Sequence, residues 1–241
     1  MEKHYEIIKA HFGKRQFSIE GLDKALGVKA SSAHLIVREL IKSRRAVRIM
    51  MGAYKLAEAK ESAPQKEINR MRRHLASILT RKFAFTGLSI LEPFIHHMPY
   101  ALIYHLFVEP GSSEEFKHEI KVPQNTAVLI NPALNEIDIM LNNTKIKKIV
   151  VIRENNYFYS SKNGLASIES AFIDLFFEVT REKMPFIKTD LEEIIKSLAL
   201  NGMINYSRLM KYAKIRGIQG ELRLFLKHIS KSVEIPKEAL K

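Results

Sequence analysis

Side chains that can hold a nucleic acid are concentrated between residues 29 and 54. The groups that can donate hydrogen bonds to base edges or phosphates are Lys29, Ser31, Ser32 and His34. The long cations that can neutralise backbone phosphates are Arg38, Lys42, Arg44, Arg45 and Arg48, and Tyr54 follows them. A single cation here is as well explained by a solvated helix end, where positive charge complements the helix dipole. The grouping as a whole predicts a surface that binds double-stranded DNA.

Two short helices are expected before this set. Apolar residues at helical spacing predict a first helix over residues 5–12, which ends at Gly13. Ser18 can cap a second helix through its side-chain oxygen, and Gly27 can end it, because glycine readily adopts the left-handed conformation at a helix C-terminus. A short connection over residues 28–30 leads to a third helix, and two helices joined in this way form a helix-turn-helix.

The third helix and a hairpin are expected to position the DNA-binding side chains. Ser31 or Ser32 can cap this helix. Its apolar positions are Leu35, Ile36, Leu40 and Ile41. β-prone residues then predict strands over 46–50 and 53–56, with Gly52 at the turn. Three helices and a hairpin in this order resemble a winged helix, in which the third helix enters the major groove and basic flanks grip phosphates.

The composition is that of an ordinary globular protein with a strong positive charge. The 241 residues carry 39 Lys and Arg against 26 Asp and Glu, a net charge of +13 that favours a polyanionic partner. Cysteine is absent, which excludes disulfides and thiolate metal sites and favours a reducing cytoplasm. No apolar run reaches the roughly 18 residues of a membrane span, and the charged residues near the start do not fit a signal peptide. We therefore expect a cytoplasmic protein without a membrane partner.

A change in composition divides the chain into two expected domains. The winged helix-turn-helix domain covers residues 1–57, and the small, polar segment 58–65 is expected to be a linker. Residues 66–241 are expected to form an α/β domain with a helical tail, which makes the whole chain an α+β protein. The first helix of this domain is predicted over 66–80, and its basic face is more typical of a solvated surface than of a second DNA contact.

Continuous apolar runs predict the strands of the second domain. The predicted strand segments are 100–108, 126–130 with 137–141, and 146–152. Ser112 and the acidic residues after it predict a short helix. The predicted helices of the tail are 167–181, 190–200, 206–216 and 220–230. A mixed sheet covered by helices is the architecture expected.

The strongest alternative is an enzyme that acts on nucleic acid or nucleotides. A Gly111-Ser112 turn followed by Glu136 and Asp138 is similar to a nucleotidyltransferase pattern, in which paired carboxylates on a strand hold Mg²⁺ and a nucleotide. The gap between turn and carboxylates is about double that of the pattern, and the alternation is also typical of a half-buried edge strand. A nuclease-like motif at residues 115–117 lies in a predicted helix. We therefore expect a protein that is not an enzyme and has no catalytic residue.

The histidines and aromatic residues of the second domain form no recognisable site. His96 and His97 are adjacent and point to opposite faces of an extended chain, and neither His105 nor His118 completes a zinc spacing. The sequence contains no glycine-rich loop for ATP or NAD, so no metal or cofactor is expected. The aromatic segment 157–159 is more typical of packing in a strand than of stacking on single-stranded bases.

Three short segments resemble the AbiEi-like transcriptional regulators, the antitoxin half of type IV toxin–antitoxin systems. The segments are Phe85–Ser89, Ser167–Leu175 and Leu209–Gly217, and their order and spacing are similar to the family. The resemblance implies a winged helix followed by an α/β domain. It also implies a regulator that binds repeats upstream of its own operon and represses it. In abortive infection such a protein offsets a nucleotidyltransferase-type toxin without forming a stable complex with it.

Overall fold

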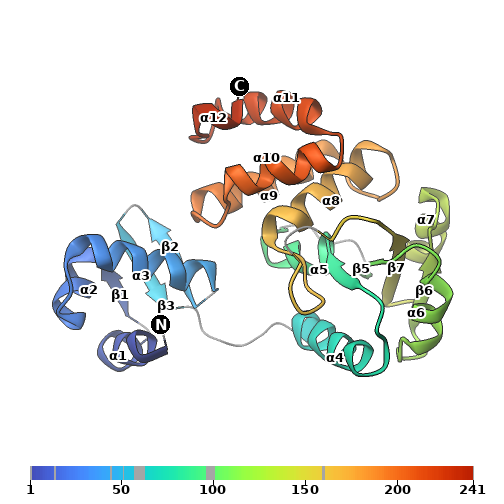
Figure 1. Cartoon of the computed structure of the whole chain (residues 1–241), viewed down its shortest axis with the longest axis horizontal. Coiled ribbons are helices and arrows are strands. Elements are labelled where there is room, and N and C mark those ends of the chain that lie inside the picture. Colours follow the sequence, from blue (N-terminus) through green and yellow to red (C-terminus); the bar gives the residue numbers. More distant parts are fainter. Residues whose placement is uncertain are drawn as a thin grey trace. The chain divides into compact units, whose positions relative to one another are not determined.

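The computed structural model describes residues 2–13, 15–43, 45–50, 52–56, 63–95, 101–158 and 161–240. Helices α1 to α12 and two sheets make an α+β fold, as the sequence predicts (Figure 1). The chain divides into two compact units, Met1–Lys60 with Leu200–Met203 and Glu61–Ala199 with Ile204–Lys241. Arg44, His96, His97, Tyr159 and most of the expected linker lie outside the described residues.

The first unit contains three helices and a three-stranded antiparallel sheet. Its elements are α1 (Glu2–Phe12), β1 (Gln16–Ser18), α2 (Ile19–Leu26), α3 (Ala30–Lys42), β2 (Ala46–Met50) and β3 (Ala53–Leu56). The strand order is β1-β3-β2, and β3 pairs with both neighbours. The helices and the hairpin are those that the sequence predicts, whereas β1 was not expected, because three residues are too short for an alternating pattern to be recognised.

Local signals set the boundaries of these elements. The Ser18 side chain accepts a hydrogen bond from the Gly21 amide at 3.0 Å, which caps α2 as predicted. Gly27 ends α2 in the left-handed conformation, with φ of 64°. The prediction that Ser31 or Ser32 caps α3 is wrong, because the helix begins at Ala30, two or three residues earlier than expected, and Lys29 occupies the cap position without a side-chain hydrogen bond. The two serines therefore lie in the first turn of α3.

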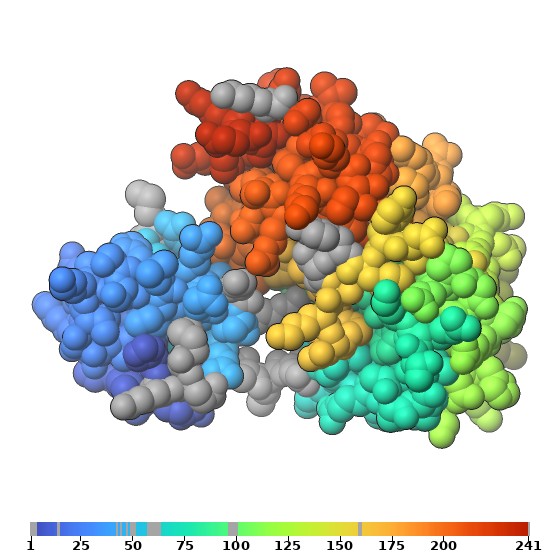
Figure 2. Space-filling view, in the orientation of Figure 1, coloured from blue at the N-terminus to red at the C-terminus, as the bar shows by residue number. Residues whose placement is uncertain are grey.

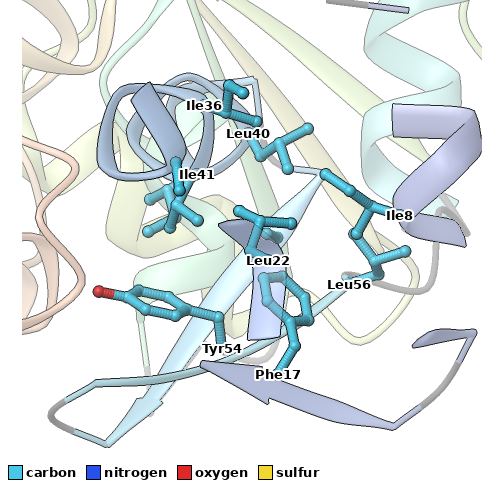
Figure 3. Close-up of a cluster of buried hydrophobic side chains, with 11 residues drawn as sticks. Ile8, Phe17, Leu22, Ile36, Leu40, Ile41, Tyr54 and Leu56 are labelled. Carbon is cyan, nitrogen blue, oxygen red and sulfur yellow. The ribbon is translucent and has the colours of Figure 1, made fainter. Parts of the chain in front are cut away.

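A hydrophobic core holds the first unit together. Figure 3 shows Ile8 of α1, Phe17 of β1, Leu22 of α2 and Leu40 of α3 gathered in the space between the helices and the sheet. Each of these side chains is at least 96% removed from solvent. Burial of side chains of this size stabilises the fold by about 1.5–3 kcal/mol each. Figure 2 shows one face of the molecule, with the described residues of the N-terminal segment in shades of blue.

The second unit is built on a four-stranded mixed sheet with the order β4-β5-β7-β6. The elements up to the end of the sheet are α4 (Ala63–Ile78), β4 (Phe83–Thr86), α5 (Leu88–Leu91), the 3₁₀ helix η1 (Glu92–Phe94), β5 (Leu102–Val108), α6 (Ser113–Glu119), β6 (Thr126–Ile130), α7 (Leu134–Asn142) and β7 (Lys148–Glu154). Strand β4 is antiparallel to β5, whereas β5, β7 and β6 run parallel. The carboxyl ends of these three strands therefore lie at the same edge of the sheet.

Both faces of the central strands are buried, as their continuous apolar sequences predict. Alternate residues of a strand point to opposite faces. Tyr104 and Leu106 of β5 lie in a core cluster with residues of α4 and α6. The next residues in the alternation, His105 and Phe107, lie on the opposite face and are also buried.

A helical tail follows the sheet. Its helices are α8 (Ile168–Thr180), α9 (Lys188–Leu200), α10 (Tyr206–Ile215), α11 (Gln219–Ile229) and α12 (Lys237–Leu240). The first four match the predicted helices to within about two residues, which is the ordinary uncertainty of a helix end. Ser167 caps α8 by accepting a hydrogen bond from the Ser170 amide at 3.2 Å. Helix α8 contacts β4, α5 and α10, so the tail packs on the sheet through α8.

The strand predicted over residues 137–141 is wrong, because this segment is helix α7. The Glu136 carboxylate accepts a hydrogen bond from the Ala133 amide at 2.7 Å and so satisfies the free N-terminal end of the helix. Leu134, Ile137 and Leu141 follow a helical spacing of three and four residues, which competes with the two-residue alternation in the same segment. Residues 157 and 158 likewise lie outside any strand.

A buried hydrogen-bond network joins the sheet to the tail. Asp174 of α8 is 2% exposed and accepts hydrogen bonds from Thr86 Oγ1 at 2.5 Å and from the Tyr212 hydroxyl at 2.7 Å. Arg216, which ends α10, lies with its Nε 3.9 Å from Asp174 Oδ1 and donates to Asn155 Oδ1 at 2.9 Å. Segments 85–89, 167–175 and 209–217 each contribute to this network.

Burial is the dominant influence on the Asp174 carboxyl, and it raises its pKa to about 7 although Arg216, Thr86 and Tyr212 oppose the shift. A folded-state pKa above the unfolded value means that the stability from this group is greatest in acid and is lost as pH rises towards 7. We predict that the free energy of unfolding of the wild type falls between pH 5 and pH 8 relative to that of Asp174→Asn. Urea titrations at both pH values measure this difference, and equal changes for the two proteins would contradict the prediction.

Gly87 lies where the chain passes closest to a buried imidazole. Its φ is +50°, and a Cβ on this residue would lie 2.6 Å from His105 Nδ1, a distance that real Cβ atoms do not show. The His105 ring is fully buried, and its backbone N–H donates to Ser89 Oγ at 2.7 Å. Burial, together with Arg153 and Arg216, lowers the pKa of His105 to about 3, so the ring stays neutral.

Gly87→Ala is predicted to destabilise the second unit for two reasons, the left-handed backbone and the clash with His105. The backbone strain alone costs about 1–3 kcal/mol, and the clash adds to it. Gly111→Ala is the matched control, because Gly111 also has a positive φ of 75° but a Cβ added there would meet no atom within 4 Å. If thermal melting shows equal losses for the two variants, the close approach to His105 is not the cause.

Candidate nucleic-acid interface

Helix α3 has one buried face and one exposed face. The residues that pack into the core are Ala33, Ile36, Val37, Leu40 and Ile41. Positions 31, 34, 35, 38 and 39 are exposed and recur every three or four residues, so they share the opposite face, with one carboxylate, Glu39, among them. This face presents a hydroxyl from Ser31, an imidazole from His34 and a guanidinium from Arg38, all of which can donate hydrogen bonds. Four of the predicted site residues, counting the half-buried Ser32 beside them, thus lie on or next to one surface.

The N-terminal end of α3 is electrically suited to an anion. Lys29 is exposed at the cap position and makes no side-chain capping hydrogen bond, and the first turn contains no acidic residue. The helix dipole places partial positive charge at this end, and the ammonium group of Lys29 adds to it. The hydroxyls of Ser31 and Ser32 lie in the same turn. A phosphate is the type of group that such an end favours.

The basic residues after α3 lie in more constrained positions. Arg45 stacks on the Tyr5 ring, with 4.7 Å between its guanidinium carbon and the ring centroid, and its amide donates to the Leu40 carbonyl at 2.8 Å. This cation–π contact ties the start of the hairpin to α1. Arg48 lies on β2 directly opposite Tyr54 of β3 and is half-buried. Beyond them, Gly52 turns the hairpin with φ of 78°.

One of the predicted site residues is buried. The Tyr54 side chain is 8% exposed and belongs to the core, where its ring lies 6.1 Å from that of Phe17. Arg44 and the side chain of Lys42 lie outside the described residues. The described members of the predicted set therefore divide into an exposed group on α3, a constrained group on the hairpin and one core residue.

Leu35 was expected among the buried positions of α3, and this expectation is wrong. Its side chain is 62% exposed, at the centre of the face that carries His34 and Arg38. The apolar type of the residue suggested the core, although position 35 lies one residue before the buried pair at 36 and 37. An exposed leucine among hydrogen-bonding groups can contact the methyl group of a thymine in the major groove.

Positive charge is concentrated in the N-terminal segment of the chain. Residues 1–57 carry 12 Lys and Arg against five Asp and Glu, in a chain whose overall excess is 13. About half of the excess charge thus lies in a quarter of the sequence. Such a concentration attracts a polyanion and accelerates its association at low salt.

The carboxylates of the alternative nucleotidyltransferase pattern are not arranged for that chemistry. Glu136 and Asp138 lie on helix α7, where residues two apart point in different directions and cannot share a metal ion. Gly111 N and Ser113 Oγ both donate to Glu154 Oε1, at 3.0 and 2.8 Å, rather than facing those carboxylates. Within the described parts of the chain, no three histidine or acidic side chains are grouped so that they could hold a metal ion.

The chain belongs to DUF6577, a family of unknown function, whose model matches residues 32–232. The matched region extends from the first turn of α3 to just beyond α11. No curated protein matches the sequence. In the part of the chain that the structure describes, no helix is both long and apolar enough to cross a membrane.

The two faces of α3 are predicted to respond differently to truncation. Leu40 is fully buried, so Leu40→Ala should lower the free energy of unfolding by about 2–5 kcal/mol. Leu35 is mostly solvated, so Leu35→Ala should change it by no more than about 0.5 kcal/mol. Urea denaturation of the two variants measures both values. A loss for Leu35→Ala as large as that for Leu40→Ala would show that this face is covered in solution.

Proposed function

We propose that this protein is a DNA-binding transcriptional regulator whose first unit is a winged helix-turn-helix. The observation that carries the proposal is the exposed face of α3, where hydrogen-bonding side chains stand clear of the core beside a helix end that favours anions. In a winged helix, the corresponding helix enters the major groove of double-stranded DNA. Its side chains then read base edges there.

The order of elements in the first unit supports this assignment. The sequence α1-β1-α2-α3-β2-β3, with a three-stranded antiparallel sheet, is the arrangement of a winged helix. Residues 27–29 make the short connection between α2 and α3. The 13 residues of α3 give a helix about 20 Å long, enough to reach several base pairs along a groove.

The proposed roles of the side chains follow from their positions. Ser31, His34 and Arg38 on the exposed face of α3 would meet base edges, and an arginine there can bond a guanine at two atoms. Lys29, at the start of the helix, would contact phosphate. Arg48 on the hairpin, with the other basic residues that the sequence places near it, would contact the neighbouring backbone. Phosphate contacts of this kind set the register of the protein and make its affinity depend on salt.

The proposal is tested by binding of the purified full chain to duplex DNA from upstream of its own gene, against a scrambled duplex, across a salt series. We expect preference for the upstream duplex. Arg38→Ala should weaken binding to it by about 1–3 kcal/mol and reduce the discrimination, because a base contact is lost. Lys29→Ala should weaken binding to both duplexes equally, and it should lower the slope of log affinity against log salt concentration by about one.

Lys9→Ala is the matched control for these variants. Lys9 is exposed on α1, in the same unit, and its removal changes the net charge by the same amount. We expect little change in preference for this variant. Equal weak binding of the wild type to both duplexes, or an effect of Lys9→Ala as large as that of Arg38→Ala, would contradict the proposal. Either result would show that the protein binds DNA only through non-specific attraction between charges.

We further propose that the regulator is the autoregulating antitoxin of a type IV toxin–antitoxin system and acts in the cytoplasm. The support for this step is the resemblance of residues 85–89, 167–175 and 209–217 to AbiEi-like regulators. A nucleotidyltransferase-type gene beside this one, toxic when expressed alone and harmless with this protein, is the expected finding. Because the toxin is offset without a stable complex in such systems, Arg38→Ala should lose repression yet still protect the cell. Toxicity that persists with the wild-type protein would refute this step.

A further inference from the structure

A cavity of about 470 Å³ lies at the carboxyl edge of the parallel strands in the second unit. Phe107 near the end of β5, Asn131 directly after β6 and Arg153 near the end of β7 all line it. Phe177 of α8 and Arg216 of α10 close it from the tail. The volume is that of an ordinary small-molecule site, and the carboxyl edge of parallel strands is where open α/β sheets bind their ligands.

Arg216 lines this cavity with part of its hydrogen-bonding capacity unused. Its side chain is 9% exposed, and its buried Nε has no hydrogen-bond partner among the described residues. Nη1 donates to Asn155, and the guanidinium carbon lies 4.2 Å from the centre of the Phe177 ring. A planar guanidinium held in this way is oriented before a ligand arrives, and its fork matches a carboxylate or a phosphate.

The negative charge of the carboxyl group that faces Arg216 is reduced at neutral pH. Its acidic neighbour is Asp174, 3.9 Å away, whose raised pKa leaves that carboxyl partly protonated. The other buried arginine of the cavity differs in this respect. Arg153 Nε lies 2.9 Å from Glu178 Oε2, and its terminal nitrogens donate to the carbonyls of Pro132 and Lys183. Both terminal nitrogens of Arg153 are therefore engaged in the wall, whereas Nη2 of Arg216 has no hydrogen-bond partner among the described residues and can receive an anion.

The rim of the cavity combines further charges with an unusual backbone. Lys183 is exposed there, and Glu154 and Glu182 supply carboxylates. Asn131 and Glu182 have positive φ angles of 44° and 53°, which side-chain-bearing residues rarely adopt. Strained residues of this kind are concentrated at binding sites, because the surrounding structure must hold them in place.

We propose that this cavity binds a small organic anion, with a carboxylate or phosphate on Arg216 and hydrogen-bond donors of the ligand facing the carboxylates of Glu154 and Glu182. Lys183 lies at the entrance and attracts the ligand. This site is separate from α3 and does not depend on DNA binding. An anion of this class would give the regulator a ligand-responsive second unit.

Isothermal titration calorimetry of the full-length protein without DNA tests the proposal. The probes are glutamate and AMP, which combine a carboxylate or a phosphate with amino donors, and acetate and inorganic phosphate, which supply the anion alone. We expect saturable one-to-one binding of glutamate or AMP, and which of the two binds separates a carboxylate ligand from a phosphate ligand. The simple anion of the same type should bind more weakly, because it leaves the rim carboxylates without donors.

Three variants locate the binding. Arg216→Lys keeps the charge but loses the planar fork, and Lys183→Ala removes an exposed charge at the rim without touching the core. Each variant should lower the affinity for the probe that binds the wild type by about tenfold. Lys227→Ala is the control, because Lys227 is exposed on α11 in the same unit and does not line the cavity. The affinity of this variant should equal that of the wild type. Failure of both organic probes to bind, or equal weakening by Lys227→Ala and Lys183→Ala, would overturn the proposal.

Discussion

The second unit depends on one buried carboxyl group. A carboxylate removed from water is unfavourable unless donors replace the lost hydration, and Asp174 is surrounded by such donors. Thr86 reaches it from the edge of the sheet and Tyr212 from the tail, so the hydrogen bonds hold a strand and two helices to one another. The same arrangement determines where Arg216 lies. Through this contact, a group buried in the interior sets the position of the guanidinium beside the cavity.

The first unit is held together by different means. Its core is apolar, and its polar contacts are local, such as the Ser18 cap and the stacking of Arg45 on Tyr5. Because the buried and exposed residues of α3 occupy separate faces, the side chains proposed to meet DNA contribute little to the core. Stability and the proposed recognition of DNA are therefore assigned to different residues of one helix. In the second unit, by contrast, the same residues serve the packing and the cavity wall.

The parts of the fold that the sequence predicts are those with a local cause. Ser18, Gly27 and Gly52 act on residues a few positions away, and each marks an element end where it was expected. The prediction of a strand at α7 was wrong because the residues of this segment fit both the periodicity of a strand and that of a helix. The Glu136 side chain, which accepts a hydrogen bond from the Ala133 amide and so favours the helix, lies within the helix itself. Ser31, His34 and Arg38 of α3 are exposed, as their predicted role requires, whereas the exposure of Leu35 on the same helix and the burial of Tyr54 on β3 depend on how the elements pack. The network and the cavity join residues far apart in the chain, and no spacing rule reveals a contact between Thr86 and Asp174, 88 positions away.

The separation of the two faces of α3 has a consequence for how proteins of this family can diverge. Residues 31, 34, 35 and 38 are released from the demands of packing, so random changes at these positions should be tolerated by the fold. On the proposed function, affinity for a given operator can change within a set of such variants while the scaffold stays constant. A library restricted to these four codons is therefore a practical starting point for retargeting the protein to a chosen sequence. The members of such a library would differ only in the surface proposed to recognise DNA.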